Sequence, residues 1–121
     1  MAQAIHVGAI HLKRVYEAPS PNDGVRILVD RLWPRGLSKA HAGIDRWMKE
    51  IAPSDDLRHW FGHDPRRWEE FRRRYHAELS RHEELLNELR AIARQGSLTL
   101  VYAACDEDHN QAVVLRDVLL H

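Results

Sequence analysis

The sequence lacks most of the features that assign a chain to a specialised class. It has one cysteine among 121 residues, which excludes an internal disulfide and favours a reducing compartment. No apolar run approaches the roughly 18 residues that a membrane-spanning helix needs. The opening MAQAIHVGAI lacks the basic start and long apolar centre of a signal peptide. We therefore expect a cytoplasmic protein that does not enter a membrane.

An excess of charge of either sign is also missing. Lys plus Arg and Asp plus Glu each number 18, so the formal net charge is zero. No global field draws the chain toward nucleic acid or anionic lipid, and binding to either would need a local patch. The 44% hydrophobic and 30% charged residues are typical of an ordinary globular domain. We predict a single domain over residues 1–121, with a homodimer as an open alternative.

Hydrophobic periodicity predicts the elements of this domain. Alternating or continuous apolar runs predict strands at 10–16, 26–32 and 97–104. Helical spacing and cap signals predict helices at 42–52, 55–61, 65–95 with a break near His82, and 106–121. This order predicts a small three-layer-like α/β domain with a short, mostly parallel sheet of about three strands covered by helices. The direction of the first strand relative to the second stays open.

Polar residues stand where each predicted strand ends. Arg14 and Tyr16 close the first strand, DRLWPRG (30–36) follows the second, and Tyr102 leads into CDEDHN (105–110). In open parallel sheets the ligand crevice lies outside the carboxyl ends of the strands. These three segments would then share one edge, and the charges of Asp30 and Arg31 would form its rim instead of being buried.

Each residue of this edge has a structural alternative. Asp30 can form an ion pair with Arg31 or Arg14 that ties strand ends together, or it can face a ligand. Arg31 and Arg35 carry planar guanidinium groups suited to a carboxylate or phosphate. Trp33 can pack in the core or stack on a planar ligand.

Histidines add a second group of candidates. His63 can be a loop residue, a cap partner or a site residue, whereas the Asp64-Pro65 pair is typical of a helix start. Asp106, His109 and Asn110 form a plausible general acid/base or metal corner, although no HxxxH or CxxC spacing supports a metal, whose identity the sequence leaves unknown. The acidic residues after Cys105 disfavour a thiolate nucleophile there.

The leading hypothesis is a pocket that binds a small anionic molecule, with hydrolytic or transfer chemistry as an extension. In that extension Asp30 or His109 would move a proton. The predicted ligand-binding residues are Arg14, Arg31, Trp33, Arg35, His63, Tyr102, Asp106 and Asn110. One alternative is a regulatory module without turnover, with a metal at His63, Asp106 and His109. The other is an interaction domain that meets a protein or RNA partner through the charged segment RRWEEFRRRYHAELSRH, although the zero net charge does not favour nucleic acid.

Three segments also carry a family resemblance. KRVYEAPSPNDGVRILVDRLWPRGLSK, IAPSDDLRHWFGHDPRRWEEFRRRY and LVYAACDEDHNQAVVLRDVL closely resemble the YeaO-like branch of the bacterial family called domain of unknown function 488. The resemblance spans about Ile10 to Leu119 and implies a compact α/β fold in a cytoplasmic bacterial protein with no established reaction. It further implies a rhodanese-like pairing of VDRLWPRG with YAACDEDHNQA, in which Asn110 stands at the position of the cysteine in longer members.

Overall fold

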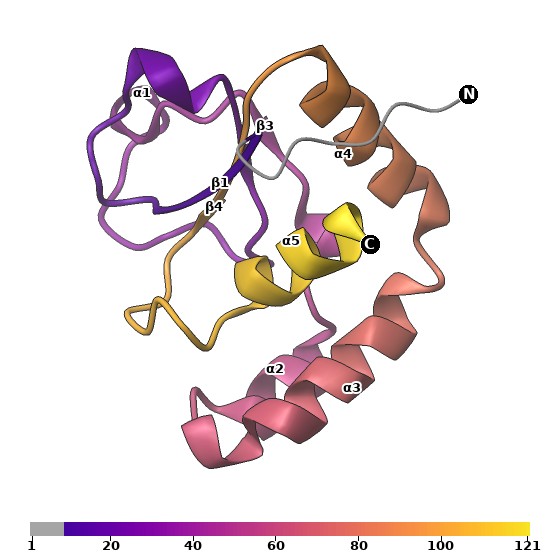
Figure 1. Ribbon diagram of the computed structural model, residues 1–121. Helices are drawn as coiled ribbons and strands as arrows, with labels where there is room; N and C mark the ends of the chain where they lie inside the picture. Colours follow the sequence, from indigo (N-terminus) through magenta and orange to yellow (C-terminus); the bar gives the residue numbers. More distant parts are fainter. Residues whose placement is uncertain (1–8) are drawn as a thin grey trace.

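A sheet of parallel strands organises the domain (Figure 1). The computed structural model describes residues 9–121, and within them the strands are β1 (Ile10–Arg14), β2 (Val25–Leu28), β3 (Arg46–Trp47) and β4 (Leu98–Tyr102). They lie in the order β1-β4-β2-β3, and every neighbouring pair is parallel. The predicted α/β class is confirmed, with one short strand more than the three or so expected. β1 and β2 run in the same direction, on either side of β4.

Helices cover this sheet and account for much of the chain. They are α1 (Lys39–Ala42), α2 (Asp55–Phe61), α3 (Trp68–Leu79), α4 (Glu83–Gln95) and α5 (Gln111–Leu120). Short 3₁₀ turns occupy Pro21–Asp23, Lys49–Ile51 and Pro65–Arg67. In residues 9–121 no helix is both long enough and apolar enough to cross a bilayer. The expectation of no signal peptide falls largely on residues 1–8, which lie outside the described part.

Cap chemistry sets several helix ends as predicted. The Ser54 hydroxyl accepts a hydrogen bond from the Leu57 backbone N–H at the start of α2. The Asp64 carboxylate accepts one from the Arg66 backbone N–H before the Pro65–Arg67 turn, which continues into α3. The expected break is also confirmed, because α3 ends at Leu79 and His82 precedes α4.

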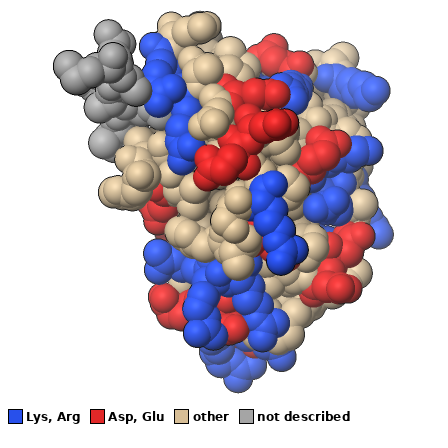
Figure 2. Space-filling view, turned by 90° about the vertical axis from the view of Figure 1, so that its right-hand side faces the viewer, with Lys and Arg blue, Asp and Glu red and all other residues tan. Residues whose placement is uncertain are grey.

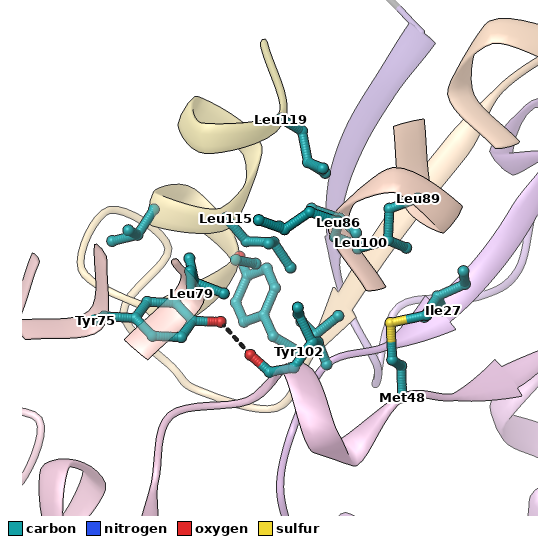
Figure 3. Packing of buried hydrophobic residues seen from close by; sticks show 14 of the residues in the cluster. Ile27, Met48, Tyr75, Leu79, Leu86, Leu89, Leu100, Tyr102, Leu115 and Leu119 are labelled. Carbon is teal, nitrogen blue, oxygen red and sulfur yellow. Dashed lines mark hydrogen bonds between the residues drawn. The ribbon is translucent and has the colours of Figure 1, made fainter. Parts of the chain in front are cut away.

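The alternation of side chains along the central strands creates two apolar layers. Ile27 and Leu100 belong to the main core beneath α2 to α5, whereas Leu28 and Val101 point into a smaller cluster on the opposite face. In Figure 3 leucines of α4 and α5 gather over this main core, and the Tyr75 hydroxyl donates a 2.7 Å hydrogen bond to a backbone carbonyl. Burial on both faces explains why β2 and β4 read as continuous apolar runs.

The predicted helix at 42–52 is wrong. Gly43 ends α1 with φ of 60°, and the following backbone pairs with β2 as the short edge strand β3. The Asp45 N–H donates to the Arg26 carbonyl at 2.9 Å, and the Met48 N–H donates to the Leu28 carbonyl at 2.9 Å. Hydrogen bonds to a neighbouring strand therefore outweigh the helical spacing of the apolar side chains in this segment.

Candidate functional site

The carboxyl ends of three strands meet at one edge of the sheet. Arg14 of β1 lies opposite Tyr102 of β4, and Leu28 of β2 lies opposite Val101. Because these strands are parallel, the segments that follow them emerge side by side. We call this region, built from residues 14–16, 30–37 and 103–111, the carboxyl edge.

Asp30 lies at the centre of the carboxyl edge and is held by its neighbours. Its Oδ2 accepts a 3.1 Å hydrogen bond from the Ala103 backbone N–H, and its Oδ1 accepts one from Gln111 Nε2. Burial raises the pKa of this carboxyl from 3.8 to about 6, although both hydrogen bonds oppose the rise. The side chain thus joins the end of β2 to the end of β4 and to the start of α5.

The predicted ion-pair partners of Asp30 have other roles. Arg31 donates from Nε to the Pro53 carbonyl at 3.1 Å and from Nη2 to the Ala52 carbonyl at 3.0 Å. In the described part of the chain neither Arg31 nor Arg14 makes a salt bridge with Asp30. Arg31 therefore ties the loop after β2 to the turn before α2.

Arg14 fixes the loop after β4. Its Nε donates to the Ala104 carbonyl at 2.9 Å and its Nη2 to the Ala103 carbonyl at 3.3 Å, with Nη2 also 3.8 Å from the sulfur of Cys105. The guanidinium carbon lies 5.3 Å from the centroid of the Tyr16 ring. An arginine in this position brings positive charge to the carboxyl edge.

Tyr16 connects Arg14 with the loop after β2. The Tyr16 hydroxyl donates to the Arg35 carbonyl at 3.3 Å, while its ring lies under the Arg14 guanidinium. Arg35 itself is exposed. Arg14 and Arg35 are 21 residues apart in the sequence, and Tyr16 brings the segments that carry them together.

Trp33 packs on the smaller apolar cluster beside this loop. Its Nε1 donates to the Leu37 carbonyl at 2.7 Å, and its ring meets the edge of Trp47 at a centroid distance of 5.6 Å. Trp47 Nε1 in turn donates to the Asp30 carbonyl at 2.7 Å. The pair of indoles therefore supports the backbone that carries Asp30.

The loop before α5 contains a histidine and an aspartate in contact. His109 Nδ1 lies 2.9 Å from Asp106 Oδ2, and the Asp106 carboxylate also accepts from the backbone N–H groups of Asp108 and His109. The hydrogen bond from Asp108 N–H is the largest of several that hold the pKa of Asp106 below its usual value, against the effect of desolvation. This pair orients one imidazole nitrogen and leaves the ring partly exposed.

Asn110 is buried and caps α5. Its side-chain oxygen accepts from the Ala112 and Val113 N–H groups at 2.9 and 3.2 Å, and its Nδ2 donates to the Asp106 carbonyl at 2.9 Å. The expected helix start at residue 106 is therefore wrong, because the acidic residues form a turn ahead of α5. Burial raises the pKa of Tyr102, which also shares a hydrogen bond with Asn110.

The rings of Phe61 and Trp68 stand between His63 and His109 of the carboxyl edge. Its ring lies 6.3 Å from Phe61, Phe61 lies 6.0 Å from Trp68, and Trp68 meets His109 edge-on at 5.2 Å. His63 has a φ of 57°, an unusual conformation for a residue other than glycine. Among residues 9–121 no three His, Cys, Asp or Glu side chains are grouped to hold a metal ion, so the His63, Asp106 and His109 set is not assembled.

Two contributors were missed by sequence reasoning. Gln111 holds Asp30, and Trp68 packs against His109. Gln111 is the first residue of α5, directly after its cap Asn110. Had the sequence analysis started this helix at the correct residue, Gln111 would have been expected near the strand ends. Trp68 has ordinary core spacing, and no local pattern distinguishes it.

Comparison with known proteins identifies the family of this chain. The family model described as "Inactive DUF488-N3 subclade" matches residues 9–121. The chain belongs to this family. It is 46% identical over 110 residues to the uncharacterized protein YeaO of Escherichia coli (strain K12). The aligned region covers 91% of this chain and 96% of YeaO. It is 40% identical over 111 residues to the uncharacterized protein Rv3073c of Mycobacterium tuberculosis (strain ATCC 25618 / H37Rv), covering 91% and 92% of the two chains. No solved structure matches the chain.

Proposed function

We propose that this member of the DUF488-N3 subclade binds a small anionic molecule at the carboxyl edge and does not turn it over. The observation that carries the proposal is the Tyr16 bridge, which brings Arg14 and the Arg35 loop to one end of a parallel sheet. Guanidinium groups bind carboxylates and phosphates through paired hydrogen bonds. Arg35, which is exposed, supplies the accessible cation, and Arg14 adds its charge while holding the loop after β4.

The contacts of the two candidate proton carriers give them structural roles that suit binding without turnover. Both carboxylate oxygens of Asp30 accept hydrogen bonds from the chain itself, and His109 Nδ1 contacts Asp106. The word "Inactive" in the description of the matching family model supports the same conclusion.

Native mass spectrometry of gently purified protein tests the proposal. The wild-type protein is expected to carry an extra mass that corresponds to an anionic metabolite, and Arg35→Gln is expected to lose it. Arg81→Gln, which removes an exposed arginine between α3 and α4, is the matched control and should retain it. An extra mass that persists in Arg35→Gln, or wild-type protein without any extra mass, would count against the proposal.

A further inference from the structure

Four exposed arginines lie together on the 3₁₀ turn Pro65–Arg67 and on α3, which follows it. We call them the arginine row, and they are Arg66, Arg67, Arg73 and Arg74. Arg66 and Arg67 lie in the turn before α3, and Arg73 and Arg74 lie within α3. Their side chains are 90%, 48%, 77% and 49% exposed. Lys and Arg side chains gather over this lower part of the molecule in Figure 2.

Trp60 of α2 orders two members of the row. The guanidinium carbon of Arg74 lies 4.3 Å from the Trp60 ring centroid, and that of Arg67 lies 5.3 Å away. Arg67 also donates a hydrogen bond to the Trp60 carbonyl. A long side chain that is already held loses less conformational entropy when a ligand binds. The indole thus prepares these two guanidinium groups for an external anion.

The arginine row carries an excess of positive charge. Asp64 pairs with Arg66 at 3.1 Å and Arg67 at 3.9 Å, and Glu70 pairs with Arg73 and with Arg74, the latter at 2.8 Å. Four cations therefore share two carboxylates, which leaves two positive charges uncompensated within the row. The local patch that a neutral chain would need for polyanion binding is present here.

We propose that the arginine row binds single-stranded nucleic acid. Four guanidinium groups spread over the turn and α3 suit a linear polyanion, because such a chain can present several phosphates to them at once. Guanidinium groups bind phosphates in a bidentate manner, and their flat faces stack on unpaired bases. An acidic peptide could present carboxylates to the arginine row, but it has no bases on which the guanidinium groups could stack. In a duplex the faces of the bases are hidden by stacking, so a single strand fits the row best.

The interaction is local and electrostatic, so its salt dependence is diagnostic. For single strands the logarithm of the affinity falls against the logarithm of salt concentration by about 0.7 per neutralised phosphate. Removal of Arg73 and Arg74 should therefore lower the slope by about 1.4. The Trp60 platform and the remaining two arginines would still be present in such a variant.

Fluorescence anisotropy with a labelled 12-nucleotide oligouridine between 50 and 200 mM NaCl tests the proposal. The wild-type protein is expected to bind saturably at 50 mM NaCl, and Arg73→Gln/Arg74→Gln to bind at least tenfold more weakly with the reduced slope. Lys39→Gln/Lys49→Gln makes the same change in net charge at exposed positions outside the row and should bind within twofold of wild type. Circular dichroism and thermal melting establish that both variants are folded.

Three results would overturn the proposal. The first is an absence of saturable binding by the wild-type protein at 50 mM NaCl. The second is equal weakening of the row variant and the lysine control, which would indicate a response to total charge. The third is competition by an oligoglutamate of the same length as effective as that by unlabelled oligouridine, which would favour an acidic protein partner.

Discussion

Removal of the Asp23 charge should destabilise the protein by about 3 kcal/mol, the low end of the cost of breaking a buried ion pair. Asp23 Oδ2 lies 2.6 Å from Arg26 Nη1, and their side chains are 10% and 5% exposed. Arg26 also donates to the Gly43 and Ala42 carbonyls at 2.9 and 3.0 Å. In Asp23→Asn these carbonyls remain, but the buried guanidinium loses its nearest counter-charge, and Lys13, 3.2 Å from the same carboxylate, loses its partner as well.

Urea unfolding followed by tryptophan fluorescence measures this loss, which corresponds to a fall in Tm of roughly 10 °C for a chain of this length. The exposed residue Asp108 provides the control, and Asp108→Asn should change stability by less than about 0.5 kcal/mol. Arg26→Met should also be strongly destabilising, whereas the double variant Asp23→Asn/Arg26→Met should cost less than the sum of the two single changes. A loss for Asp23→Asn no larger than that of the Asp108 control would refute the reasoning.

The same carboxyl gives the protein an acid-sensitive contribution to stability. Burial alone would raise the pKa of Asp23, but hydrogen bonds from the Ser20 backbone, Arg26 and Lys13 together lower it below 3.8. The free energy of unfolding that this group contributes is therefore present above pH 4 and is lost as the pH falls through the pKa of the folded state. Asp23→Asn should remove this part of the acid dependence.

Three further changes test other parts of the structure. Because the pKa of Asp30 is raised to about 6, its contribution to the free energy of unfolding is greatest below pH 4 and is lost as the pH rises through 6. The urea midpoint of the wild-type protein should therefore fall over this pH range, and Asp30→Asn should abolish that part of the fall. An unchanged fall in Asp30→Asn would contradict the raised pKa of Asp30. Asn110→Ala should cost about 1–2 kcal/mol, because α5 loses its cap, and a thermal melt equal to wild type would argue against it. Tyr75→Phe should cost about 1–2 kcal/mol through the unpaired Ile51 carbonyl, as measured by urea unfolding, and a neutral effect would show that this bond is dispensable.

Local signals in the sequence predicted several elements correctly because their causes are local. The caps at Ser54 and Asp64 and the interruption near His82 depend on neighbouring backbone groups, and all three are found in the structure. The family was likewise predicted from three motifs and is confirmed. The continuous apolar runs of β2 and β4 correctly indicated strands buried on both faces.

The errors came from contacts distant in sequence. The spacing of Ile44, Trp47 and Met48 predicted a helix, but hydrogen bonds to β2 form an edge strand there instead. The carbonyl partners of Arg31 and the hydrogen bond from Gln111 to Asp30 likewise join residues that lie 21 or more positions apart. The sequence was sufficient to place these residues at strand ends, but it did not indicate which distant residues they hydrogen-bond to.

Arginine side-chain NMR during a titration with inorganic pyrophosphate most directly tests an anion site at the carboxyl edge. The Nε–H signals of Arg14 and Arg35, assigned with Arg14→Gln and Arg35→Gln variants, are expected to shift together and saturably, while that of Arg81 stays unchanged. Small shifts without saturation, spread equally over all exposed arginines, would contradict the account.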